Sequence, residues 1–156
     1  MPTMYDAVLL LHSWIRWAVL LLALLVLSRA ISGRSQHRPW TPADDTVMKW
    51  LVIVVDIQFL LGLALYVALS PTTKAAFADP GSIMRTSALR FWTVEHLTGM
   101  LAAVALVHVG RVMVRRTTDG DEKHGKALTF IAIALFLMLL SIPWPGMPNG
   151  RELFRL

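Results

Sequence analysis

Seven polar or ionisable residues lie inside long apolar stretches, and their types could support chemistry there. They are His12, Arg16, Asp56, Gln58, Glu95, His96 and His108. An ionisable group at membrane depth is costly unless it is paired or solvated, so each of these residues is a candidate functional residue. Imidazoles bind metals and carry protons, whereas guanidinium and carboxylate groups neutralise opposite charges. A redox cofactor, a metal site, a proton path and a buried ion-pair network are all compatible with this set.

Four apolar segments must position these residues, at about 7–27, 47–69, 88–114 and 127–142. Each is close to the ~20 residues that an α-helix needs to cross a bilayer. Helices are expected because lipid offers no hydrogen-bond partner to an open backbone. Of the 156 residues, 56 % are hydrophobic and only 16 % are charged, too few for the surface of a soluble domain. The sequence predicts one all-α domain, residues 1–156, that forms an integral membrane four-helix bundle.

The connecting segments carry turn signals and an uneven distribution of charge. Ser32 and Gly33 are expected to end the first helix, and Pro143 and Pro145 to end the fourth. The formal net charge of +5 is attributed to loops that lie against anionic lipid headgroups, not to nucleic acid. The absence of cysteine excludes disulfides, thiolate iron–sulfur clusters and c-type haem attachment.

The orientation in the membrane follows from the lysines and arginines of alternate loops. Eight lie between the first and second or the third and fourth segments: Arg29, Arg34, Arg38, Arg111, Arg115, Arg116, Lys123 and Lys126. Five lie on the other side: Lys74, Arg85, Arg90, Arg151 and Arg155. Because cytoplasmic loops are enriched in these residues, we expect both termini outside the cytoplasmic membrane.

Counting along the helices places the polar residues at two depths. His12 and His96 fall at similar levels in the outer half of the membrane, with Glu95 beside His96, whereas Arg16, Asp56 and Gln58 fall near the midplane. A buried arginine in a membrane helix needs a carboxylate, so Arg16 is expected to pair with Asp56.

His108 lies about 18 Å further inward than His96, because twelve helical residues separate the two. We find no second histidine at its level. It is therefore expected to be an ordinary polar residue beside Arg111 at the inner interface.

The sharpest hypothesis makes His12 and His96 the two axial iron ligands of one haem b. Such a site needs two imidazoles from different helices at one depth. Arg16 would neutralise a propionate, and Glu95 or a backbone carbonyl would hold the outer proton of one imidazole. Three alternatives remain open. They are a cofactor-free ion-pair network of His12, Arg16, Asp56 and Glu95, a metal site of His12, Glu95, His96 and Met100, and a proton path.

Four runs resemble small bacterial four-helix membrane proteins that are commonly labelled cytochrome b-like. They are LHSWIRW (11–17), LLGLALY (60–66), FWTVEHLTGM (91–100) and SIPWPG (141–146). The resemblance implies haem b, with His12 and His96 as ligands, and electron transport in a bacterial inner membrane. It also implies a place beside a larger respiratory or photosynthetic complex. A cofactor-free accessory subunit of such a complex is the second interpretation, and self-association within the lipid bilayer is a further possible partnership.

Overall fold

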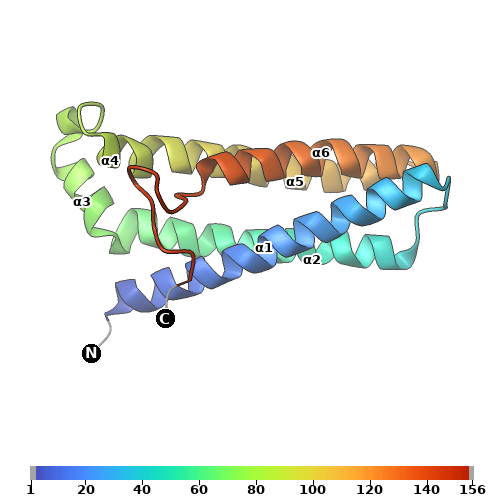
Figure 1. The fold of residues 1–156 in the computed structure, drawn as a ribbon, viewed down its shortest axis with the longest axis horizontal. Coiled ribbons are helices and arrows are strands. Elements are labelled where there is room, and N and C mark those ends of the chain that lie inside the picture. Colours follow the sequence, from blue (N-terminus) through green and yellow to red (C-terminus); the bar gives the residue numbers. More distant parts are fainter. Residues whose placement is uncertain (1–2, 155–156) are drawn as a thin grey trace.

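The computed structural model describes residues 3–154, which form an elongated bundle of helices (Figure 1). Its long helices are α1 (Met4–Ser35), α2 (Pro42–Ala64), α5 (His96–Arg116) and α6 (Gly120–Ser141). Between α2 and α5 lie the short helices α3 (Pro71–Ala78) and α4 (Ser87–Arg90). The same region holds the 3₁₀ turn η2 (Pro80–Ser82) and the π-helical turns η1 (Leu65–Leu69) and η3 (Phe91–Glu95). The described residues contain no strand, which confirms the predicted all-α class.

Four continuous helical spans are long and apolar enough to cross a membrane: Met4–Ser35, Pro42–Leu69, Ser87–Arg116 and Gly120–Ser141. Large apolar side chains such as Leu21, Leu60 and Phe136 are exposed on their outer faces. Exposed leucine and phenylalanine along a whole helix are expected where lipid is the solvent. The predicted membrane bundle of four helices is therefore confirmed.

The order of the helices around the bundle places α1 and α5 at opposite corners. Helix α1 packs against α2 and α6, and α5 packs against α6 and α2. Figure 1 shows α1 running obliquely across α2, while α5 and α6 lie side by side. Side chains that point inward from α1 and α5 consequently face each other across the interior.

Two helix ends differ from the prediction. Helix α1 continues through Gly33 to Ser35, and α6 begins at Gly120, so both extend well beyond the expected limits of 27 and 127. Gly33 lies inside α1, and the imidazole of His124 packs directly on it. A Cβ at position 33 would overlap this ring, so the position requires glycine. The glycine marks a close approach of α1 and α6, not the end of a helix.

Charged hydrogen bonds fasten the end of the bundle at which residues 36–41 connect α1 to α2. The carboxylate of Asp44, which is 3 % exposed, accepts from Nε of Arg29 at 2.8 Å and from Nη1 of Arg38 at 2.6 Å. Asp44 and Thr41 also form a reciprocal cap at the start of α2. Arg29 and Arg38, two of the basic residues counted for the predicted membrane orientation, thus bond to Asp44 at this end of the bundle. Arg155, which was also counted, lies outside the described residues.

Replacement of Gly33 by alanine should destabilise the protein. The ring of His124 is fully buried and has no space to retreat from the new methyl group, so we expect a loss of about 1–3 kcal/mol in the free energy of unfolding. Thermal unfolding in detergent would measure it. The double variant Gly33→Ala/His124→Ala should recover part of the loss that the two single variants predict together. Strict additivity would contradict this contact.

The pKa of His37 should lie above its ordinary value, because its Nδ1 is 2.6 Å from Oδ2 of Asp121 and the carboxylate favours the protonated ring. The contact joins the 36–41 connection to α6. Its contribution to stability is full below the unfolded pKa of about 6.5 and is lost as the pH rises through the higher folded pKa. An NMR titration should find the His37 pKa lower in Asp121→Asn than in the wild type and unchanged in Glu122→Gln.

Candidate functional site

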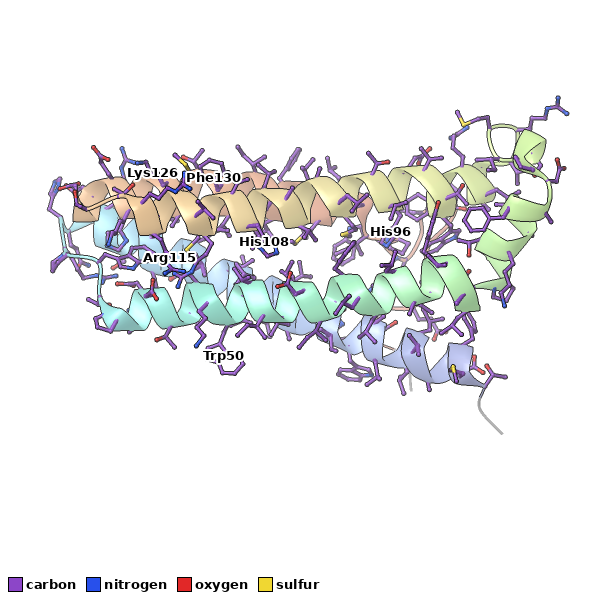
Figure 2. All side chains as sticks on the ribbon, turned by 180° about the vertical axis from the view of Figure 1, so that it is seen from behind. Trp50, His96, His108, Arg115, Lys126 and Phe130 are labelled. Carbon is purple, nitrogen blue, oxygen red and sulfur yellow. The ribbon has the colours of Figure 1, made fainter. Side chains whose placement is uncertain are left out.

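A partly open cavity lies between α1, α2 and α5 at the end of the bundle that carries α3. Its volume is about 160 Å³ and its walls are mainly apolar. His12 from α1 and His96 from α5 both line it, together with Arg16 and Met100. In Figure 2, His96 lies in the space between the ribbons of α5 and α2. The structure thus brings the two predicted histidines to one cavity from opposite corners of the bundle.

The imidazole of His96 is held by the end of α6. Its Nδ1 lies 2.8 Å from the carbonyl oxygen of Ser141. A carbonyl accepts but cannot donate, so Nδ1 carries the proton and Nε2 keeps a free lone pair. Among the described residues, no hydrogen bond reaches Nε2 of His96. This is the arrangement in which a histidine is fixed through one nitrogen and can ligate a metal through the other.

Two prolines explain why this carbonyl is free. In an α-helix the carbonyl of residue i accepts from the N–H of residue i+4, and proline has no N–H. Pro143 and Pro145 therefore leave Leu139 and Ser141 without that backbone donor. The indole Nε1 of Trp144 donates to the Leu139 carbonyl at 2.8 Å, and His96 donates to that of Ser141.

His12 is packed closely but incompletely satisfied. Its ring lies against Gly62 of α2, where a Cβ would come within 3.1 Å of Cε1. The backbone carbonyl of His12 accepts a 3.0 Å bond from Nε2 of Gln58. Among the described residues, Nδ1 of His12 and Oε1 of Gln58 are buried without a hydrogen-bond partner. Buried polar atoms without partners are costly, so this part of the cavity is suited to a polar group that the chain does not supply.

Residues 143–154, which we name the strap, cross from the end of α6 to α1 (Figure 1). The carbonyl of Leu153 accepts from Nη2 of Arg16 at 2.9 Å and from Nε1 of Trp17 at 3.2 Å. Phe154 stacks on Trp17 with ring centroids 5.3 Å apart. Arg151 and Glu152 of the strap line the cavity, so the strap forms one of its walls.

The π-helical turns η1 and η3 flank the cavity on α2 and α5. The hydroxyl of Tyr66, in η1, donates to the carbonyl of Thr93, in η3, at 3.1 Å. A π-turn interrupts the regular bonding of a helix and is frequent at functional sites. Because η3 ends directly before His96, it determines which way the His96 side chain points from α5.

The predicted pair of Arg16 and Asp56 is wrong. Arg16 bonds to the strap, whereas Oδ1 of Asp56 lies 2.7 Å from Nε2 of His108 on α5. Gln58 faces α1, and Asp56, two residues away, points roughly 200° from it and therefore away from α1. His108, expected to be an ordinary polar residue beside Arg111, therefore has Asp56 as its partner.

Glu95 does not join the histidines. Its Oε1 accepts from Nε of Arg90 at 2.6 Å, and both side chains are substantially exposed. Adjacent helical residues point about 100° apart, so Glu95 turns outward when His96 turns inward. The proton of His96 is held instead by a backbone carbonyl, the other option expected for it. Within residues 3–154 no group of three or more histidine, aspartate or glutamate side chains could hold a metal ion.

No protein-family model, curated protein or solved structure matches the chain. The fold and the cavity define the class of protein: an all-α membrane helical bundle with two histidines in an apolar interior.

Several residues of the cavity were not identified from the sequence. The Ser141 carbonyl could have been found, since the prolines at 143 and 145 remove specific backbone donors. The ring centroid of Trp92 lies 5.5 Å from that of His96. The two residues are four apart in the sequence, and this spacing is too common in helices to indicate a site. The strap has no periodic pattern, and nothing in its sequence indicates that it returns to α1.

Arg16→Met should loosen the strap, because it removes the guanidinium that donates to Leu153. One net hydrogen bond is worth about 1 kcal/mol, so we expect amide hydrogen exchange in residues 143–154 to accelerate roughly fivefold. Arg90→Met is the matched control, because Arg90 bonds to Glu95 and not to the strap. Equal exchange in the wild type and Arg16→Met would contradict the role given to Arg16.

Proposed function

We propose that the protein is a membrane-embedded, b-type cytochrome-like electron-transfer protein with one haem b between α1 and α5. His12 and His96 are the proposed axial ligands of the iron. We further propose that it resides in a bacterial inner membrane with both termini outside, as the distribution of lysine and arginine favours.

The observation that carries the proposal is the pair of imidazoles on one apolar cavity, presented by helices at opposite corners of the bundle. Two neutral nitrogen ligands from different helices are what a low-spin haem requires. The bond from His96 to the Ser141 carbonyl leaves its Nε2 available. The unpartnered Nδ1 of His12 shows that this second ring is not held by a competing internal bond among the described residues.

The charged residues of the cavity fit a ligand that is apolar in its body and anionic at its edge. Arg16 and Arg151 both line the cavity, and Nε of Arg16 is buried with no partner in the described chain. Guanidinium groups bind carboxylates strongly, so these arginines would hold propionates. The apolar walls would exclude water from the rings of the histidines.

The cavity is too small to enclose a whole haem. An apolar cavity of similar volume in another protein holds a single benzene ring. A haem is larger, so it would extend through the open side of the cavity. When bound, haem supplies an iron that takes up and releases one electron, and the protein supplies ligation, burial and nearby positive charge.

The test is a reduced-minus-oxidised absorption spectrum of the protein purified from haem-replete cells. We expect sharp haem bands that are lost in His12→Ala and in His96→Ala, since each variant removes one proposed ligand. His108→Ala is the matched control, because His108 lies on the same helix as His96 but bonds to Asp56 outside the cavity. It should retain the bands at wild-type intensity.

A colourless and well-folded wild-type protein would refute the cytochrome proposal. That result would favour the alternative, a cofactor-free accessory subunit of a larger respiratory or photosynthetic membrane complex. Bands that survive in both ligand variants would assign the haem to other residues. A transition metal found by elemental analysis without porphyrin would move the assignment to a metal site.

A further inference from the structure

The bond between His108 and Asp56 lies on an outer face of the bundle. Nε2 of His108 and Oδ1 of Asp56 are 2.7 Å apart, and the side chains are 46 % and 45 % exposed. Figure 2 looks directly onto this face, which α5 and α2 form, and shows His108 between their ribbons. Neither residue lines the cavity described above.

The depth of this pair makes its exposure significant. Asp56 follows Pro42 by fourteen residues in the span Pro42–Leu69, so it lies about 21 Å along that helix, near its middle. Ionisable residues at the centre of a membrane almost always face the interior of a bundle or a water-filled cavity. Here no other described residue covers them, so half of each polar side chain would face hydrocarbon in an isolated chain.

The surroundings of the pair on this face are apolar or small. On α5, Leu101 and Val112 are each 44 % exposed, and Ala105, one turn from His108, is also exposed. On α2, Leu60 lies one turn from Asp56 and is 61 % exposed. The other charged groups on this side of α2 and α5 are Asp45 and Arg111, which bond to each other, exposed Lys49 one turn of α2 after Asp45, and Arg115 nearer the 36–41 end.

We propose that the face formed by α2 and α5 is the contact surface between two copies of this chain in the membrane, with Asp56 and His108 at its centre. The face carries one acid and one base side by side. A two-fold axis through such a face places the base of each copy opposite the acid of the other, which makes the face complementary to itself. The contact removes the pair from lipid, and small Ala105 permits close approach of the helices.

This inference rests on Asp56 and His108, neither of which lines the cavity. Lipid cannot satisfy the exposed polar atoms, because it offers neither donors nor acceptors in the hydrocarbon region. A second copy is the partner that the chain itself supplies with matching charges at matching depth. A polar contact of this kind contributes affinity and fixes the register of the two copies.

The first test uses the absence of cysteine from the sequence. Ala105→Cys places one thiol beside the pair, and Leu21→Cys, the control, places one on the exposed face of α1. A short bismaleimide is added to membranes that contain either variant. We expect a covalent product of twice the chain mass from Ala105→Cys and little from Leu21→Cys. Equal yields, or products only with other proteins, would overturn the proposal.

The second test distinguishes a charge-paired contact from simple apolar association. Energy transfer between labelled copies in vesicles measures the dissociation constant of the dimer. Asp56→His and His108→Asp should each associate roughly tenfold more weakly alone, because each opposes like groups. A mixture of the two variants should regain the wild-type affinity, since acids then oppose bases. Circular dichroism verifies that both variants keep their helices, and if either variant is unfolded, the thiol test alone decides. Failure of the folded mixture to associate would overturn the proposed pairing.

Discussion

Hydrocarbon offers no hydrogen-bond partner to a free backbone carbonyl, and this constraint underlies the arrangement of the cavity. The chain interrupts its helices at prolines 143 and 145 and at the π-turns, and side chains donate hydrogen bonds to three backbone carbonyls near these interruptions. Trp144, His96 and Tyr66 bond to the carbonyls of Leu139, Ser141 and Thr93. The irregular backbone thus fixes the orientation of His96. The hydrogen bond from His96 to Ser141 therefore satisfies a backbone carbonyl and orients the imidazole of His96 at the same time.

Hydropathy and helical spacing predicted the fold because both depend on local sequence. Four apolar stretches of sufficient length predicted four membrane helices, and counting the rise per residue predicted similar depths for His12 and His96, which the structure places on one cavity. The helix ends at Gly33 and Gly120 were less predictable. A glycine that ends a helix and a glycine that admits a neighbouring ring look identical in sequence, and only the position of His124 distinguishes them.

The partners of Asp56 and Arg16 could not be predicted by counting residues along the helices. Such counting gives the depth of a residue in the membrane but not the direction in which its side chain points around the helix axis. The order of the four helices around the bundle decides which groups meet. Gln58 turns toward α1, so Asp56 turns toward α5 and meets His108 there. Arg16 then bonds to a carbonyl of the strap instead. The polar residues consequently divide into two sets, one inside the cavity and one on an outer face.

The strap follows all four spanning helices in the chain, yet it forms part of the cavity wall against α1. During synthesis the helical walls therefore exist before this wall does. The strap can therefore cover the cavity only after the residues of α1, α2 and α5 that line it have been synthesised. The position of the strap at the end of the chain makes this wall the last part of the cavity to form.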